Sequence, residues 1–308
     1  MATQHIEGTQ EAMILNQRQT SVGFVGLGTM GDPMASNVAG GGYDVRLYDV
    51  DIERSQALAA RIGATALQSS EDLAGCEAVV FMLPTSAIVR SVLLTDAGVL
   101  RVPFRPGTVL IDMSSSDPNE TLETGRLLAA HGVHLVDAPV SGARARAENG
   151  TLAIMMGADD EEAADRAEPI IQTMSERIFR TGALGTGHAM KALNNFVAAA
   201  AYTASTEALV AGERFGLDPQ TMVDIFNAST GQSFVTTHVL EDHIVKRNYA
   251  TGFALPLMTK DVRIALNLQQ SVHHAAPVCE AVTGALSDAL EALGNVDHSK
   301  AFEFWQQR

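Results

Sequence analysis

Lys191 is a side chain that could transfer a proton, and Asn195 is an amide placed to assist it. They lie four residues apart in a segment with the composition of a helix, so they share one helical face, one turn apart. Lys191 is near the expected start of that helix, where the positive end of the helix dipole lowers the pKa of an amine toward the range useful for a general base. The Asn195 amide could orient the amine or a substrate oxygen. Taken alone, such a pair is more often surface decoration.

A glycine-rich turn follows the first expected strand and has the pattern G-x-G-x-x-G, formed by Gly26, Leu27, Gly28, Thr29, Met30 and Gly31. The first glycine permits a tight turn, the second lets a pyrophosphate approach the backbone, and the third allows close packing of the next helix. The phosphates would then lie at the helix N-terminus. The pattern alone is weak evidence, but here a strand precedes it and a helix follows.

Asp49 lies at the end of the next expected strand, 18 residues after Gly31. An acid there accepts a hydrogen bond from the ribose 2′-hydroxyl of NAD and repels the 2′-phosphate of NADP. We therefore predict a dinucleotide cofactor, with NAD preferred over NADP. NADP remains the alternative cofactor, because Arg46 or Arg54 could bind its 2′-phosphate.

Three further polar turns could hold ligands. Met82 to Thr85 and Asp112 to Ser115 each follow a strand at its carboxyl end, where open α/β sheets bind ligands, although ordinary turns would look the same. In a third turn, the hydroxyl and N–H groups of the Ser141–Gly142 step could hold a carboxylate. Arg144 and Arg146 come next, and surface arginines are usually only solvated.

The elements that must position these residues alternate from Ser21 to about Arg180. Short apolar runs, SVGFVG, VRLYDV, AVVFML, TVLIDM, HLVDA and LAIMMG, are separated by helix-compatible segments. The runs are apolar throughout, as are strands that are buried on both faces. This pattern predicts an α/β, Rossmann-type, doubly wound parallel sheet with helices on both faces.

The second half of the chain has no strand signal after Thr181. His188 to about Phe215 predicts one long helix. Asp218 and Pro219 form the cap and first turn of another helix that ends near Ala228, and Cys279 to Leu293 predicts one more. We expect an all-helical C-terminal domain, joined to the first domain by the long helix.

The 308 residues suit two domains. We predict a flexible N-terminal extension at 1–20, an NAD-binding Rossmann-like domain at 21–183, and a helical substrate and oligomerisation domain at 184–308. The mainly apolar second half predicts burial against another subunit, and thus a homodimer or homotetramer.

Composition excludes several classes of function. Thirty-six acidic against 21 basic residues give a net charge of −15, which opposes binding to nucleic acid or anionic membranes. Cys76 and Cys279 are too far apart in sequence for a metal-ligand spacing, and the nine histidines, including His273–His274, show no ligand set. With no secretory signal and no membrane-spanning run, we expect a cytoplasmic protein without a metal.

Together, the motifs resemble those of the β-hydroxyacid dehydrogenase family, which includes 3-hydroxyisobutyrate dehydrogenase and tartronate semialdehyde reductase. GFVGLGTMGDPMASN is similar to the family's cofactor signature, DAPVSGARARAENGTL to its substrate-binding segment, and GTGHAMKALNN to its catalytic segment. Gly252, Phe253 and Leu257, leading to Lys260 and Asp261, resemble its late cofactor-contacting stretch. The resemblance runs from about 22 to 299.

The resemblance implies a role for each matching residue. Lys191 would be the catalytic lysine and Asn195 its partner. The residues that would bind substrate are Ser141, Gly142 and Ala143, and those that would contact the dinucleotide, besides the glycine-rich turn and Asp49, are Leu83, Pro84, Ser115 and Lys260.

The sequence departs from the family pattern at three places. Ala143 stands where the family usually has a second glycine, and Ser115 replaces a more common threonine. Gln232 and Phe234 lie in a stretch where relatives often carry Gly-Arg-Ser-Trp, so these two are candidates for setting specificity.

The expected activity is the NAD-dependent oxidation of a small 3-hydroxy acid of the 3-hydroxyisobutyrate type. The acid would bind in the interdomain cleft, with Lys191 as general base and, in the reverse direction, general acid. Three alternatives stay open: a reductase of a 2-hydroxy-3-oxo acid such as tartronate semialdehyde, an imine reductase, and a dinucleotide-binding protein without turnover. Lys191 argues against the imine reductase, because those relatives generally replace the lysine.

Overall fold

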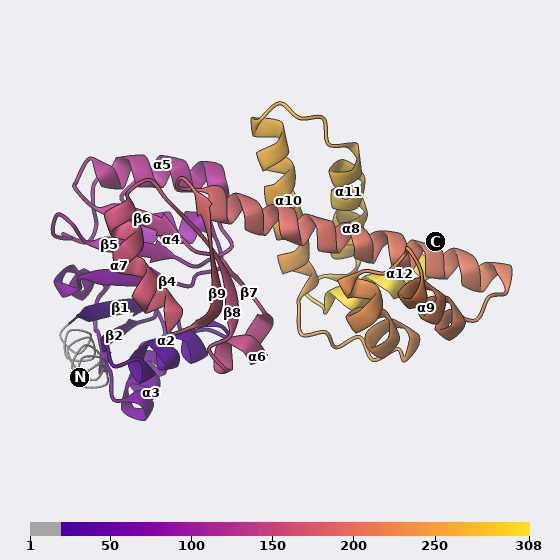
Figure 1. The fold of residues 1–308 in the computed structure, drawn as a ribbon, viewed down its shortest axis with the longest axis horizontal. Coiled ribbons are helices and arrows are strands. Elements are labelled where there is room, and N and C mark those ends of the chain that lie inside the picture. Colours follow the sequence, from indigo (N-terminus) through magenta and orange to yellow (C-terminus); the bar gives the residue numbers. More distant parts are fainter. Residues whose placement is uncertain (1–19) are drawn as a thin grey trace, which may run out of the picture. The chain divides into compact units, whose positions relative to one another are not determined.

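The computed structural model describes residues 20–308, and the predicted extension therefore lies outside the described residues except at Thr20. The chain divides into two compact units, one that ends at Lys191 and one of Ala192–Arg308. One long helix, α8 (Thr186–Phe215), belongs to both, because the division falls within its second turn (Figure 1).

The first unit is built on one sheet of nine strands. These are β1 Ser21–Val25, β2 Asp44–Tyr48, β3 Thr65–Ala66, β4 Ala78–Phe81, β5 Val109–Asp112, β6 His134–Asp137, β7 Val140–Ser141, β8 Leu152–Ala158 and β9 Ser175–Gly182. Their order is β3-β2-β1-β4-β5-β6-β8-β7, and β9 pairs with β8. The sheet is the predicted Rossmann-type architecture, with β1 as the third strand from one edge.

Strand direction is confirmed for the first five predicted strands and wrong for the sixth. β2, β1, β4, β5 and β6 are mutually parallel, whereas β8 runs antiparallel to β6. A parallel strand needs a crossover of a dozen or more residues. The connection here, residues 138–151, contains β7, which itself pairs antiparallel with β8, and only a six-residue helix, α6 (Ala143–Glu148). The chain therefore turns back on itself instead of crossing over. β9 was not predicted, because its sequence SERIFRTG is charged and largely exposed.

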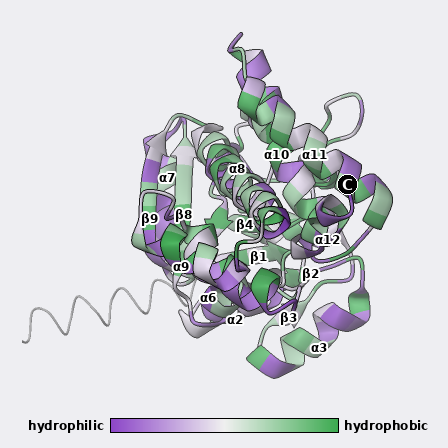
Figure 2. Cartoon of the chain, turned by 90° about the vertical axis from the view of Figure 1, so that its right-hand side faces the viewer, coloured by the Kyte–Doolittle hydropathy of each residue, from purple (hydrophilic) through white to green (hydrophobic). Residues whose placement is uncertain are grey.

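Helices cover both faces of this sheet, as predicted (Figure 1). Besides α6 they are α2 Gly31–Gly40, α3 Ile52–Ile62, α4 Ser86–Leu93, α5 Pro118–Ala129 and α7 Glu161–Gln172, with a 3-10 turn at Ser70–Gly75. The sheet has a hydrophobic core on each face. Successive residues of β4 point to opposite faces, so Val80 packs into one core while Val79 and Phe81 pack into the other. Helix α3 is amphipathic, with both hydrophobic and hydrophilic residues along it (Figure 2). Its hydrophobic face includes the buried Leu58.

The second unit is helical, as predicted. After α8 come α9 Pro219–Ala228, α10 Leu255–Ser271, α11 Pro277–Leu293 and α12 Ala301–Gln306, with a π-helical segment at Thr236–Val245 and a 3-10 turn at His298–Lys300. Asp218 caps α9 through its side chain, and the His273–His274 pair lies just beyond the end of α10. The core packs around the fully buried Tyr202. None of the helices within 20–308 is long and apolar enough to cross a membrane.

Candidate active site

The glycine-rich turn between β1 and α2 needs its glycines for three different steric reasons. Gly26 has a φ of +90°, and a Cβ there would lie 2.4 Å from the Met82 carbonyl oxygen. A Cβ on Gly31 would lie 1.8 Å from the carbonyl oxygen of Gly26, so only glycine lets α2 start so close to the turn. A Cβ on Gly28 would meet no atom within 4 Å. The space beside Gly28 is thus open to a ligand, and this is the position at which a pyrophosphate approaches the backbone.

The start of α2 is suited to an anion. Its first residues follow Met30, which makes no side-chain cap hydrogen bond. By contrast, side chains cap four other helices of this unit, those that begin after Asp51, Thr85, Asp117 and Asp160. The N–H groups of the α2 first turn and the helix dipole favour a phosphate at this end.

Asp49 is buried directly behind the glycine-rich turn. Its Oδ2 accepts a 2.7 Å hydrogen bond from the Leu27 N–H, and its Oδ1 accepts one of 2.9 Å from the Asp51 N–H. The carboxylate therefore fixes the turn and keeps acceptor capacity, because each oxygen has two lone pairs. Arg54 reaches Asp49 at 3.7 Å and Asp51 at 3.2 Å, and Arg46 pairs with Asp44.

The turns after β4 and β5 lie next to the glycine-rich turn. The Leu83 side chain borders Gly26, and the Leu83 N–H donates to the Ser114 hydroxyl at 2.9 Å. Leu83, Pro84 and Ser115 are thereby placed at the carboxyl edge of β1, β4 and β5. Strand order reverses at β1, which is where open α/β sheets bind dinucleotides. The residues present fit a dinucleotide there.

The predicted substrate segment bends sharply between β7 and α6. Ser141 ends β7, Gly142 has a φ of +139°, and Ala143 has a φ of +55°. The left-handed conformation of Ala143 explains why a glycine would be the ordinary choice at this position. The stem of Arg146 covers Gly142, since a Cβ there would lie 2.5 Å from Arg146 Cδ, whereas Arg144 binds Glu148 at 2.7 Å.

The two predicted catalytic residues lie in consecutive turns of α8. Lys191 is half-buried and is the last residue of the first unit. In the second unit, the Asn195 side-chain amide donates a 2.6 Å hydrogen bond to Oδ2 of the buried Asp261. Lys260 lies on α10 with its Nζ 3.3 Å from Asp261 Oδ1. Sequence analysis identified Asp261 only as part of a motif and missed its contact with Asn195.

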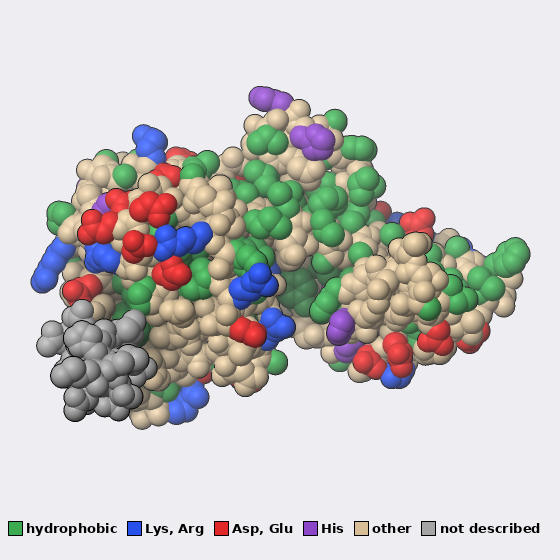
Figure 3. Space-filling model, viewed as in Figure 1, with side chains coloured by type: hydrophobic (Ala, Val, Ile, Leu, Met, Phe, Trp, Pro, Cys, Tyr) green, Lys and Arg blue, Asp and Glu red, His purple; other side chains and the backbone are tan. Residues whose placement is uncertain are grey.

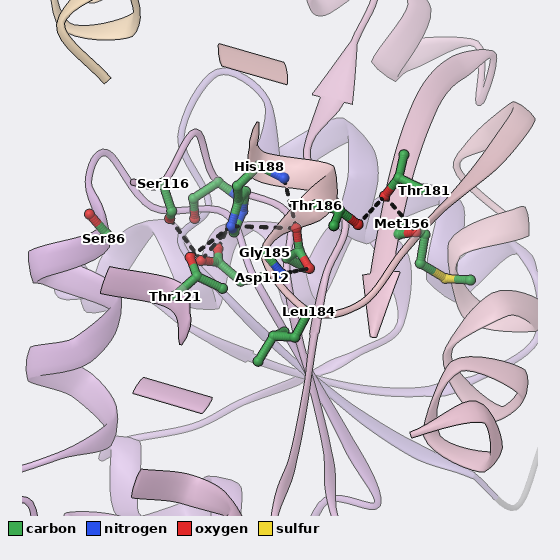
Figure 4. Close-up of polar contacts among 12 residues, drawn as sticks. Ser86, Asp112, Ser116, Thr121, Met156, Thr181, Leu184, Gly185, Thr186 and His188 are labelled. Atoms are coloured by element: carbon green, nitrogen blue, oxygen red, sulfur yellow. Dashed lines mark hydrogen bonds and ion pairs between the residues drawn. The ribbon is translucent and has the colours of Figure 1, made fainter. Parts of the chain in front are cut away.

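A buried cluster at the first turn of α8 was also missed. Asp112 at the end of β5 and His188 of α8 lie side by side there (Figure 4). Asp137 at the end of β6 lies 3.8 Å from the same imidazole. The sequence offered a weak signal, since each acid ends an apolar strand and carboxylates are seldom buried without a partner. Gln232 and Phe234, the candidates for setting specificity, lie between α9 and the π-helical segment, where the Phe234 ring is exposed and stacks on His238.

Comparison with known proteins gives consistent matches over the whole described chain. Residues 21–182 match the family model of the NAD-binding domain of 6-phosphogluconate dehydrogenase, and 185–305 match the NAD-binding domain of NADP-dependent 3-hydroxyisobutyrate dehydrogenase. The chain is 34% identical to 2-(hydroxymethyl)glutarate dehydrogenase of Eubacterium barkeri over 94% of this chain and 96% of that protein. It is also 34% identical to 3-hydroxyisobutyrate dehydrogenase of Pseudomonas aeruginosa, over 89% and 92%.

Among solved structures, the 3-hydroxyisobutyrate dehydrogenase of Mycobacterium tuberculosis with L-serine superimposes with a TM-score of 0.83. It is 31% identical in sequence, and the match covers 92% of this chain and 98% of that one.

The strain at Ala143 leads to a stability prediction. Ala143→Gly should raise the free energy of unfolding by about 0.5–1 kcal/mol, because relief of the left-handed strain exceeds the entropy cost of glycine. Ala145→Gly in the same short helix is the matched control and should lower it by about 1 kcal/mol. Urea unfolding measures both changes. A loss of stability in Ala143→Gly would contradict the assigned conformation.

Proposed function

The chain belongs to the 3-hydroxyisobutyrate dehydrogenase family, an NAD(P)-dependent family of 3-hydroxyacid dehydrogenases, and from this premise we propose that it oxidises a small 3-hydroxyisobutyrate-like acid with NAD. One observation carries the proposal. The first turn of α8 is hydrogen-bonded to Asp137 at the end of β6. This contact fixes the turn that carries Lys191 at the same edge of the sheet as the glycine-rich turn. A candidate base and a dinucleotide cradle thus share one rigid frame.

In this proposal Lys191 takes the proton of the substrate hydroxyl as general base, and in the reverse direction it donates that proton to the carbonyl oxygen. A bound NAD would supply the acceptor for the hydride of the carbinol carbon. Asn195 orients the lysine and the substrate oxygen. Ser141, Gly142 and Ala143 hold the carboxylate through hydroxyl and N–H groups. Orientation, rather than covalent catalysis, provides the rate.

The charges around Asp49 support NAD over NADP. The buried carboxylate would lie close to a 2′-phosphate and repel it, while its remaining lone pairs suit a ribose hydroxyl. Arg54 is held by two acids and Arg46 by one, so each cation is already neutralised by a carboxylate. Leu83, Pro84 and Ser115 would complete the part of the dinucleotide site that the first unit provides.

The named relatives favour one substrate pattern. 3-Hydroxyisobutyrate, 2-(hydroxymethyl)glutarate and L-serine, on which curated relatives act according to their names, all carry a hydroxymethyl group on the carbon next to a carboxylate. We propose this pattern for the present substrate. Reduction of a tartronate semialdehyde-like acid is the second candidate. Lys191 disfavours imine reduction and supports turnover over simple dinucleotide binding.

We also propose a homodimer or homotetramer in the cytoplasm. Hydrophobic side chains gather over α10 and α11 (Figure 3) and would be buried in an assembly; Leu257, Val272 and Val278 are among the exposed ones. Both cysteines are free and buried, which suits a reducing compartment. Burial also raises the pKa of the Cys76 thiol to about 11, so this thiol is unreactive.

Replacement of Lys191 tests the reaction class. Lys191→Met keeps the length of the side chain without its amine and should lower kcat by about 10²–10⁴-fold, the usual contribution of general acid–base catalysis. The measurement is NADH formation across a panel of hydroxymethyl carboxylic acids, with exposed Lys300→Met as control. Equal rates in wild type and Lys191→Met would contradict the role of Lys191, and turnover of none of the acids by the wild type would contradict the substrate class.

Replacement of Asp49 tests cofactor choice. Asp49→Asn keeps an acceptor for the Leu27 N–H and removes the charge that opposes a 2′-phosphate. The ratio of kcat/KM with NAD to that with NADP should fall by about tenfold, which corresponds to 1.4 kcal/mol of lost discrimination. Glu53→Gln, which removes an exposed charge on α3, should leave the ratio within twofold. An unchanged ratio in Asp49→Asn would rule out this role.

A further inference from the structure

The buried cluster at the first turn of α8 is not used by the proposed reaction. The His188 side chain is fully buried, and its Nε2 lies 3.8 Å from Asp112 Oδ2 while its Nδ1 lies 3.8 Å from Asp137 Oδ2. Figure 4 shows the imidazole beside side chains from β5 and α5, at the point where α8 begins. Charged groups are costly to bury unless they are paired. The protonation states of these two carboxylates and of the imidazole must therefore be compatible with one another.

Asp137 holds the start of α8 from a strand some fifty residues earlier. Its Oδ1 accepts a hydrogen bond from the Gly185 N–H and its Oδ2 from the His188 N–H, each at 2.7 Å. Cβ atoms on Gly157 or Gly187 would lie 2.6 and 2.8 Å from this carboxylate, so both must be glycine. Burial raises the pKa of Asp137, and the charge of His188 and the two N–H donors act against that rise. The carboxylate is thus a non-local cap of α8.

The contacts of Thr121 favour a proton on Nδ1 of His188. Thr121 Oγ1 lies 3.1 Å from the Asp117 carbonyl oxygen, which can only accept, and 2.8 Å from His188 Nδ1. A hydroxyl has one hydrogen, so when Thr121 donates to Asp117 its oxygen accepts from an Nδ1–H.

Nε2 of His188 faces an acid. It is buried and has no hydrogen-bond partner among the described residues, and the nearby Asp112 carboxylate accepts from the Ser114 N–H at 3.0 Å and the Ser116 hydroxyl at 2.8 Å. A lone pair on Nε2 would repel this carboxylate, whereas an N–H would be attracted to it.

We propose that His188 is an imidazolium, with a hydrogen on both ring nitrogens, and that it is a positioning residue for Lys191. The charged groups near it are Asp112 from β5, Asp137 from β6 and Lys191 on the next turn of α8, while α5 contributes the Thr121 hydroxyl. The two carboxylates offset the helix dipole, which alone would disfavour a cation at this end.

The consequence for Lys191 follows from helix geometry. Residues three apart share a face, with Cβ atoms about 5–6 Å apart. The cluster therefore fixes the turn that carries Lys191. The positive charge of His188 offsets its two carboxylates, and without it those carboxylates would stabilise the Lys191 ammonium more strongly. This functional part rests on the proposed role of Lys191, whereas the charge state of His188 does not.

Nuclear magnetic resonance tests the charge state without any turnover. In the full chain labelled with ¹⁵N-histidine and saturated with NADH, the His188 signals are those missing from His188→Asn. At neutral pH both ring nitrogens should have the shift of a protonated nitrogen. One nitrogen with the shift of a bare lone pair would overturn the proposal. If His188→Asn does not fold, the His188 signals are assigned as those that move in Thr121→Val.

Kinetics test the positioning role. Thr121→Val removes the Nδ1 partner and should lower kcat about tenfold or more, as small misplacements of catalytic groups do, and should move the acidic limb of the pH profile of kcat/KM to higher pH. Thr121→Ser, which keeps the hydroxyl, should restore both. Thr124→Val, one turn along α5 and without a hydrogen bond to the cluster, is the matched control.

The outcomes separate a positioning role from a general loss of stability. NADH affinity should stay within twofold of wild type in all three variants, because the glycine-rich turn is untouched. An unchanged acidic limb in Thr121→Val, or the same loss of kcat in Thr124→Val, would overturn the positioning role. If the wild type oxidises no acid in the panel, the proposed function fails, and the resonance measurement alone still decides whether His188 is charged.

Discussion

The arrangement of the first unit depends on the pair of hydrogen bonds that Asp137 accepts from the N–H groups of Gly185 and His188. These two hydrogen bonds join strand β6, which the sheet holds in place, to the start of α8, a helix of 30 residues. Without this carboxylate, the first N–H groups of α8 would be buried without an acceptor. The position of Lys191 relative to the sheet follows from this contact, since a helix is rigid over one turn.

The same sheet edge also holds the glycine-rich turn, so one framework positions both the proposed cofactor site and the proposed base. Gly26 and Gly31 bring α2 against the end of β1, and Gly28 leaves open the space that a pyrophosphate would fill. Asp49 holds this turn from behind through the Leu27 N–H. Hydride transfer demands that donor and acceptor carbons meet in one orientation, and a rigid strand edge meets that demand better than a loop.

Sequence patterns predicted those features that depend on residues close together in the chain. The glycine spacing of 26–31 and the caps of helices depend on neighbours in sequence, and the structure places these residues as predicted at the turn and the helix ends. The direction of β8 and the strand β9 were missed, because pairing partners are chosen in three dimensions and a charged edge strand has no apolar run. The contacts of Asp137 with His188 and of Asp261 with Asn195 join residues about 50 and 66 positions apart, and no spacing rule predicts them.

The central claim is that this protein moves a hydride from the carbinol carbon of a hydroxymethyl carboxylic acid to NAD. The most direct measurement is mass spectrometry of the NADH formed from 3-hydroxyisobutyrate that carries deuterium on its carbinol carbon. We predict that the nicotinamide gains one deuterium per turnover, with none lost to water, since hydride transfer does not exchange with solvent. NADH without the label, or a label shared with solvent protons, would contradict direct transfer and with it the account of the site.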